Sequence, residues 1–381
     1  MRSKNQRVQS RDITVQRLFA LLRGGLFGCT IDTSLFEGEV DWKNIMLLAE
    51  EQTVLALVFD GITLLPKSCA PDKEILFEWF GRVAFIEQEN RRLNAGIGEV
   101  VGLYNAKGVH PVLLKGQGIG QYYRNPLHRN AGDIDLYFPD GIEEANRIAA
   151  AWDGVAFHEE TSHHVAFTWK NLVVENHRSY FNFYSPSNQR RWEEVKGMIP
   201  LTDGETLSLD NCTVPVPSPQ MNALYIFLHL WHHCHQKGIG LRHVCDWACL
   251  WSACGSRIDK DLFVKTATML PVLRPMTAVA WIAENCLGLD RNVIPLDTTT
   301  RQAKKDGEFL LDDILRMGNF GRATDMMKGF QRGKHLGNLR TYFLAFKRQM
   351  TLFRLCPSEI VAYPIEWLVR NVKYRVAFFC M

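Results

Sequence analysis

Residues 111–138 read PVLLKGQGIGQYYRNPLHRNAGDIDLYF, and this stretch establishes the centre of the fold. Its apolar run at 112–114 stops at a Lys-Gly pair, and apolar residues alternate with polar ones over 133–138. These patterns predict a strand, a glycine-rich turn with a short helix, a loop, and a second strand that ends before the Pro-Asp-Gly of 139–141.

Two acidic residues stand at alternate positions of the second predicted strand. Because side chains two residues apart on a strand point to the same face, Asp133 and Asp135 aim their carboxylates at one point. Adjacent carboxylates repel each other unless a cation lies between them, and Mg²⁺ is the usual one. The backbone from Gly116 to Gly120 can approach an anion closely and donate N–H groups to it. Together these features indicate a site for a nucleoside triphosphate.

The Leu-Lys-Gly of 114–116, Arg129 and the Gly-Asp-Ile-Asp-Leu of 132–136 resemble the nucleotidyltransferase superfamily that includes DNA polymerase β. The likeness is to the branch described as uncharacterised bacterial nucleotidyltransferases, which carry a Leu-Lys-Gly motif. In the superfamily, a helical turn opened by Gly-Ser or a variant precedes Asp-x-Asp, and a third acidic residue follows on a later strand. Here Lys115-Gly116 stands in place of Gly-Ser. Residues 42–52 are also similar to the helical lead-in of this branch.

A hairpin is predicted downstream, with strands over 163–169 and 172–177 and a turn at Lys170-Asn171. Glu175 and His177 share one face of its second strand. In the branch that this chain resembles, the third acidic residue is commonly Asp and is followed two positions later by His. The resemblance therefore implies that Glu175 is the third carboxylate.

The resemblance implies an enzyme that moves a nucleoside monophosphate from an NTP to an acceptor and releases pyrophosphate. Asp133, Asp135 and Glu175 are the expected catalytic and metal-binding residues, holding two Mg²⁺ ions for which Mn²⁺ can substitute. The expected nucleotide-binding residues are Lys115, Gly116, Gln117, Arg129, Gly132, Arg242 and Asp246. The acceptor is left open among a small molecule, a protein and an RNA.

Simpler interpretations exist for the acidic residues. Asp133 and Asp135 can be surface carboxylates at a strand end, and Glu175 an exposed hairpin residue. Arg242 and Asp246, one helical turn apart, can form an ion pair with each other, or one of them can contact the nucleotide or the acceptor.

Lys115 and Arg129 also have simpler interpretations. Lys115 can be solvent-exposed at the end of its strand, and Arg129 can be a loop charge or can neutralise a phosphate or an aspartate. The glycines at 116, 118 and 120 fit neither the Gly-x-Gly-x-x-Gly pattern of dinucleotide folds nor a Walker loop. The same fold also permits an inactive nucleotide-binding or interaction protein, and a toxin-like enzyme that attaches a nucleotide to protein or RNA.

A histidine cluster occupies 229–235, with His229 and His233 one helical turn apart. Such spacing can bind zinc. However, the segment has no His-Glu-x-x-His, and the aromatic and apolar residues between the histidines favour a helix packed on several sides. We interpret these histidines as packed or hydrogen-bonded.

Composition sets the broad class. The 381 residues suffice for two or three domains, and 46% hydrophobic with 22% charged content is ordinary for a globular protein. A net charge of +3 is too small to argue for nucleic acid by itself. The 10 cysteines contain no Cys-x-x-Cys pair, which favours reduced thiols. No apolar run approaches about 18 residues and the N-terminus lacks the core of a signal peptide, so we predict no transmembrane segment and a cytoplasmic location.

The predicted fold is α+β, with a small mixed sheet as nucleotidyltransferase core and helical regions on both sides of it in sequence. The predicted domains are 1–92, 93–217 and 218–381. Helical periodicity covers 13–24, where Gly24-Gly25 is expected to end the helix, 41–64 with a break near 52–53, and 73–106. Residues 201–216 hold either two short strands or an irregular connection. Ser218-Pro219 starts a helix that ends near 236, and another covers 241–253.

The segment 316–354 is basic. It holds nine cations and a single acid, Asp325; the cations are Arg316, Arg322, Lys328, Arg332, Lys334, Arg340, Lys347, Arg348 and Arg354. Most such runs are solvated helix faces, but this one also fits an anionic partner such as an RNA, a phosphorylated metabolite or a membrane surface.

Overall fold

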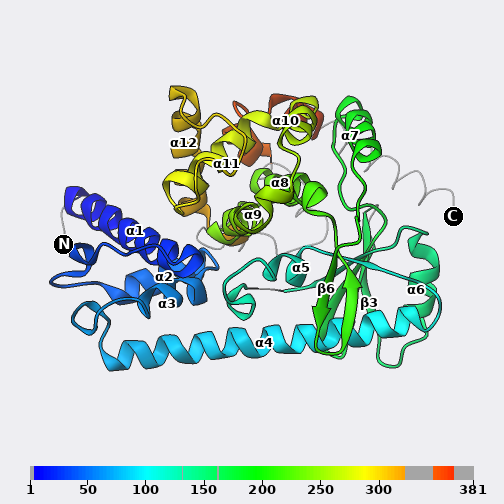
Figure 1. The fold of residues 1–381 in the computed structure, drawn as a ribbon, viewed down its shortest axis with the longest axis horizontal. Helices are drawn as coiled ribbons and strands as arrows, with labels where there is room; N and C mark the ends of the chain where they lie inside the picture. Colours follow the sequence, from blue (N-terminus) through cyan, green and yellow to red (C-terminus); the bar gives the residue numbers. More distant parts are fainter. Residues whose placement is uncertain (1–3, 131, 161–162, 322–345, 364–381) are drawn as a thin grey trace.

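The structure is a computed structural model that describes residues 4–130, 132–160, 163–321 and 346–363, with side chains from residue 13 onward. A long helix, α4 (Lys73–Asn105), runs beneath both a group of N-terminal helices and a mixed sheet, and a C-terminal group of helices lies above it (Figure 1). The predicted α+β class is confirmed.

Three helices form the N-terminal group: α1 (Lys4–Phe27), α2 (Trp42–Glu51) and α3 (Leu55–Ile62). The 3₁₀ turns η1 (Thr33–Phe36) and η2 (Lys67–Cys69) connect them to each other and to α4. The predicted break between α2 and α3 is confirmed, and Thr53 within it has a φ of 54°. The predicted end of the first helix at Gly24-Gly25 is wrong. A Cβ at Gly25 would stand 2.0 Å from the carbonyl oxygen of Leu57, so this glycine allows α1 to approach α3 rather than ending the helix.

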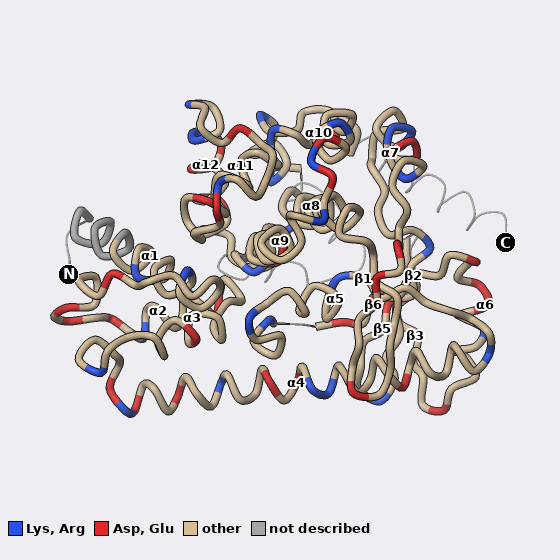
Figure 2. Tube along the Cα trace, in the orientation of Figure 1, with Lys and Arg blue, Asp and Glu red and all other residues tan. Residues whose placement is uncertain are grey.

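The helix α4 is continuous across residues 92 and 93, where we predict the first domain boundary. Its first half contributes Trp79 and Val83 to the core of the helical groups, whereas Leu93, Ile97 and residues after them pack into the core of the sheet. Residues of both charges follow one another along this helix (Figure 2). Several of these charges form ion pairs one turn apart, such as Glu78 with Arg82 at 2.7 Å.

Five strands form the sheet, in the order β1-β2-β5-β4-β3. They are β1 (Val112–Leu114), β2 (Ile134–Tyr137), β3 (Ala156–Glu160), β4 (His164–Trp169) and β5 (Leu172–His177). The pair β2/β5 is parallel and the other pairs are antiparallel. The predicted hairpin is confirmed: Lys170 and Asn171 have φ values of 47° and 62°, as a tight turn of two left-handed residues requires.

The remaining elements around the sheet are short. They are α5 (Gly116–Gly120), η3 (Pro126–His128), α6 (Ile142–Ala150), α7 (Pro186–Met198), β6 (Thr206–Leu209) and β7 (Cys212–Pro215). The strands β6 and β7 form a separate antiparallel hairpin, so of the two possibilities for residues 201–216 the pair of short strands is confirmed.

The C-terminal group consists of α8 (Pro219–Gln236), α9 (Leu241–Cys254), η4 (Gly255–Arg257), α10 (Lys260–Met269), α11 (Leu273–Asn285), α12 (Arg301–Met317) and η5 (Asn319–Gly321). The hydroxyl of Ser218 accepts from the Met221 N–H at 3.2 Å, which confirms the predicted start of α8. Helices α8 and α9 are buried along most of their length and cover the sheet side of the group (Figure 1). None of the helices described is both long and apolar enough to cross a membrane.

Most of the basic segment, residues 322–345, lies outside the described part of the chain. Three of its other cations are paired within the fold. Arg348 forms a buried ion pair with Asp313 at 2.5 Å, Arg316 contacts the same carboxylate at 3.1 Å, and Arg354 lies 3.3 Å from Asp306. These three arginines therefore neutralise acids of the fold, and an anionic partner for the segment stays a prediction.

Candidate active site

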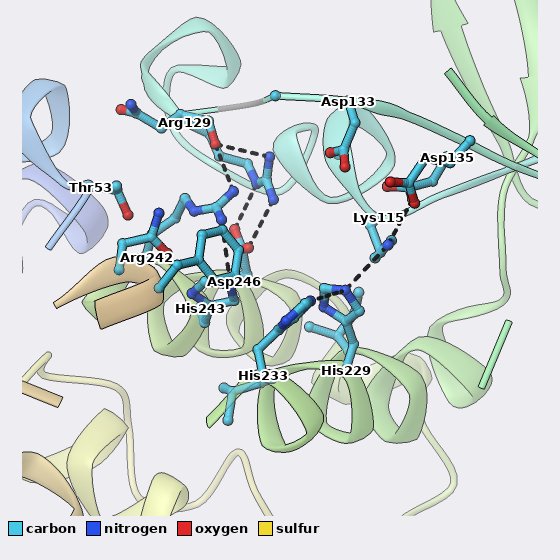
Figure 3. A pocket seen from close by; sticks show the side chains of 18 of the residues that line it. Thr53, Lys115, Arg129, Asp133, Asp135, His229, His233, Arg242, His243 and Asp246 are labelled. Carbon is cyan, nitrogen blue, oxygen red and sulfur yellow. Dashed lines mark hydrogen bonds and ion pairs between the residues drawn. The ribbon is translucent and has the colours of Figure 1, made fainter. Parts of the chain in front are cut away.

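A cavity of about 580 Å³ lies between the sheet and helices α8 and α9 (Figure 3). It is lined by nine of the ten residues predicted for the site: Lys115, Gly116, Arg129, Gly132, Asp133, Asp135, Glu175, Arg242 and Asp246. The tenth, Gln117, turns toward α4 and donates to the side-chain oxygens of Asn90 and Asn94 at 3.1 and 2.6 Å. Gln117 therefore positions α5 against α4.

Three carboxylates meet on one side of this cavity. Asp133 and Asp135 share a face because they are two residues apart, and Asp135 pairs with Glu175 in the parallel β2/β5 register. One carboxylate oxygen from each of the three lies within 4.8 Å of the others. Asp133 is exposed to the cavity, Glu175 is half-buried, and Asp135 is only 2% exposed.

Positive groups surround the buried carboxylate. Asp135 Oδ1 lies 2.7 Å from Lys115 Nζ and 2.8 Å from His177 Nε2. Burial alone would raise the pKa of Asp135, but the Lys115 ammonium and the His177 hydrogen bond hold it below its ordinary value. The like charge of Asp135, together with burial, raises the pKa of Asp133 to about 6. The neighbouring carboxylates, Asp135 above all, therefore affect Asp133 more strongly than the nearby Lys115 ammonium does.

This donor set fits a divalent cation. Carboxylate oxygens are the ligands that Mg²⁺ prefers, and a further positive charge would relieve the repulsion that raises the pKa of Asp133. Asp135 is buried, so its interpretation as a surface carboxylate at a strand end is wrong.

Lys115 has an unusual backbone as well as a charged contact. Its φ of 48° and ψ of −139° are rarely adopted by a residue with a side chain and store strain on the order of 1–3 kcal/mol. The ammonium lies between Asp135 and His229, whose Nε2 is 3.2 Å away. Burial alone would lower the pKa of Lys115, but Asp135 raises it above its ordinary value. The interpretation as an exposed lysine at a strand end is therefore wrong.

The other side of the cavity is cationic. Arg129 binds the carboxylate of Asp246 through two hydrogen bonds, at 2.7 and 2.9 Å. Tyr123 donates its hydroxyl proton to the same carboxylate at 2.6 Å. The ion pair of Asp246 is thus formed with Arg129 rather than with Arg242, which is the partner that the helical spacing suggests.

Arg242 is held differently. Its Nη1 donates to the carbonyl oxygen of Asn130 at 2.9 Å, and its Nη2 lies 3.4 Å from His243 Nε2. The buried Nε has no hydrogen-bond partner among the described residues. Burial is the main cause that lowers the pKa of Arg242, and the positive charge of the neighbouring Arg129 lowers it further. This arginine therefore retains an unused donor beside the cavity.

The sequence model of the family described as "Uncharacterised nucleotidyltransferase" matches residues 38–288, more than half of the 381 residues. The chain belongs to this family. Searches of curated proteins and of solved structures gave no match. The matched residues extend from the loop before α2 to the loop after α11. The family match therefore includes residues from both sides of the cavity.

The histidine cluster of this nucleotidyltransferase-family chain faces the site in part. His229 and His233 line the cavity and lie 3.0 Å apart, Nε2 to Nε2. Burial lowers the pKa of both rings. For His229, the positive charge of the neighbouring Lys115 lowers the pKa further. The structure's described part holds two groups of three metal-ligand side chains, and neither includes a histidine of 229–235. These contacts fit the interpretation as packed, hydrogen-bonded histidines.

Sequence reasoning missed several residues that line the cavity of this family member: Thr53, His164, Lys237, His243, Asn319 and Phe320. A signal existed for His164, because it is the second residue of the strand predicted over 163–169, which pairs with the strand of Glu175. Thr53, Lys237 and Asn319 carry no local signal, since the break after α2, the end of α8 and η5 reach the cavity only through tertiary packing.

Proposed function

We propose that this chain is an Mg²⁺-dependent nucleotidyltransferase that moves a nucleoside monophosphate from an NTP to an acceptor hydroxyl or similar nucleophile. The observation that carries the proposal is the meeting of Asp133, Asp135 and Glu175, with one oxygen of each within 4.8 Å of the others. Membership of the uncharacterised nucleotidyltransferase family supports it.

The three carboxylates take the roles that their positions favour. Asp133 and Asp135 would hold the metal ions, and Glu175 would complete the acceptor side and take the proton of the nucleophile. When bound, the metal ions would supply positive charge to the triphosphate and to the attacking oxygen. The acceptor oxygen forms a bond to the α-phosphorus, the bond from that phosphorus to the bridging oxygen breaks, and pyrophosphate leaves.

Residues on both sides of the cavity would hold the nucleotide. Gly116 would approach the β and γ phosphates with its backbone N–H, and Lys115 lies beside it. The unused Nε of Arg242 is a donor for a phosphate or ribose oxygen, and Lys237 makes no ion pair among the described residues. Arg129 and Asp246 neutralise each other and would shape the wall of the cavity.

The test is the melting temperature with each of the four NTPs, with and without Mg²⁺, for the wild type and for Asp133→Asn. Binding to the folded state alone stabilises by about 2.7 kcal/mol at a hundredfold excess over Kd. We expect an Mg²⁺-dependent rise with at least one NTP, its loss in Asp133→Asn, and its retention in Asp140→Asn, a matched control with an exposed carboxylate after the same strand.

Pyrophosphate release then separates transfer from mere nucleotide binding. Release with a candidate acceptor, lost in Asp133→Asn, supports transfer. A rise in melting temperature without pyrophosphate release from any acceptor class would favour an inactive nucleotide-binding protein. The absence of a rise with every NTP would contradict the proposal.

A further inference from the structure

A second group of ligand-type side chains lies beside the carboxylates and shares one of them. His164, Glu175 and His177 each offer one ligand atom within 4.8 Å of the other two. Glu175 and His177 are two residues apart on β5, and His164 is the direct partner of His177 in the antiparallel β4/β5 pair. Strand geometry therefore directs all three to one face of the sheet.

The distances within this group are close to those of a metal site. His177 Nε2 lies 3.4 Å from Glu175 Oε2, and His164 Nε2 lies 3.9 Å from Glu175 Oε1. Atoms that bind one metal at about 2.1 Å lie roughly 3.0–3.4 Å from one another. These two distances end on different oxygens of Glu175, so binding one metal would require its carboxylate to turn and the rings to move inward from their present separation of within 4.8 Å.

The burial of the group also suits a metal. The side chains of His177, His164 and Glu175 are 9%, 19% and 21% exposed. The group is thus shielded from bulk solvent on one side, while His164 and Glu175 line the cavity on the other. Such an arrangement leaves coordination positions open to a substrate oxygen or to water.

We propose that His164, Glu175 and His177 form a second divalent-cation site, which binds a first-row transition ion in preference to Mg²⁺. Metal binding would displace the proton that His177 shares with Asp135. Two imidazole nitrogens with one carboxylate then suit ions such as Mn²⁺, Co²⁺ and Zn²⁺, whereas Mg²⁺ favours oxygen ligands. The proposal deepens the proposed function, because Glu175 belongs to both groups, but binding of the metal does not require nucleotide transfer.

The competing explanation is that the rings only hold carboxylates in place by hydrogen bonds. His177 already bonds to Asp135 at 2.8 Å, so this explanation has a contact in its favour. The two explanations differ in metal preference. A ligand contributes to the preference for transition ions over Mg²⁺, whereas a residue that only positions carboxylates affects both kinds of ion alike.

The experiment uses the full chain freed of metal and without nucleotide. Co²⁺ is titrated by its visible absorption and Mg²⁺ by calorimetry, for the wild type, His164→Gln, His177→Gln and Asp133→Asn. The matched control is His158→Gln, an exposed histidine on β3 whose ring bonds to the Ala156 carbonyl.

We expect Co²⁺ to bind the wild type more tightly than Mg²⁺. We expect His164→Gln to weaken Co²⁺ by at least about tenfold while leaving Mg²⁺ affinity nearly unchanged, and Asp133→Asn to weaken mainly Mg²⁺. His164→Gln keeps the test valid if His177→Gln does not fold, because the hydrogen bond to the buried Asp135 comes from His177.

Equal weakening of Co²⁺ and Mg²⁺ in His164→Gln, or an unchanged Co²⁺ spectrum in both histidine variants, would overturn the proposal. A failed transferase is distinguishable from a failed metal site. If the wild type neither binds NTP nor releases pyrophosphate but its Co²⁺ spectrum requires His164, the metal site stands and the transferase proposal falls.

Discussion

Arg129 and Asp246, 117 residues apart in the chain, form a buried ion pair with two parallel hydrogen bonds of 2.7 and 2.9 Å. Arg129 follows η3 beside the sheet, and Asp246 lies on α9, so the pair joins the sheet region to the C-terminal helices at the wall of the cavity. The two residues are 4% and 5% exposed. Loss of either partner would leave an uncompensated charge away from water.

This pair gives the first prediction. Asp246→Ala should lower the free energy of unfolding by about 3–5 kcal/mol, because Arg129 then stays buried without its carboxylate. Chemical denaturation measures the change. The double variant Arg129→Met/Asp246→Leu should lose much less stability than the sum of the losses in Arg129→Met and in Asp246→Leu. Additive losses would mean that the two side chains do not stabilise each other.

A second prediction concerns Lys115 and the metal. Lys115→Met should lower the free energy of unfolding of the metal-free protein by about 3–5 kcal/mol, because Asp135 loses the ammonium that compensates its buried charge. Mg²⁺ should restore part of this loss, since a bound cation neutralises the same carboxylate. Denaturation in EDTA and in Mg²⁺ measures both effects. The matched control, Lys237→Met, removes an exposed cavity lysine and should change stability little; an equal loss in the control would contradict the role of Lys115.

The third prediction is a pH dependence at His128. Its Nδ1 lies 2.8 Å from Asp60 on α3, and its Nε2 lies 2.9 Å from Glu87 on α4. Both ring nitrogens can donate only in the protonated imidazole. Burial alone would lower the pKa of His128, but the two carboxylates raise it above its ordinary value of 6.5.

A raised pKa means that the protonated ring stabilises the folded state. This contribution is fully present below pH 6.5 and is lost as the pH rises through the folded pKa. The difference in unfolding free energy between the wild type and His128→Gln should therefore be larger at a pH of about 5.5 than at a pH of about 9. A difference that is constant with pH would show that folding leaves the pKa of His128 unchanged, and a smaller difference at low pH would show that the folded state favours the neutral ring.

The fourth prediction concerns the crossing of α1 and α3. A Cβ at Gly61 would stand 2.1 Å from the carbonyl oxygen of Leu21, and backbone cannot move aside as a side chain can. Gly61→Ala should lower the free energy of unfolding by about 1–3 kcal/mol or more. Gly81→Ala on α4 is the matched control, since nothing lies within 4 Å of its added Cβ. The control should raise stability by about 0.5–1 kcal/mol, and a neutral Gly61→Ala would mean that the helices separate at little cost.

Local patterns predict most of the elements that carry the site. The strands β1, β2 and β5 and the turn at Lys170-Asn171 follow from apolar alternation and turn residues. The strand β3 has no such pattern, because its five residues are all exposed at the sheet edge. It exists through its pairing with β4, which no local pattern encodes.

Strand periodicity in the chain is enough to place Asp133 with Asp135 on one face, and Glu175 with His177 on one face, because strand side chains repeat every two residues. That these two faces coincide follows from the fold, through the parallel β2/β5 pair. The fold also brings Lys115 to Asp135 and His229, and pairs Asp246 with Arg129 rather than with Arg242. Contacts between distant segments depend on how α8 and α9 pack over the sheet, whereas periodicity acts only within a segment.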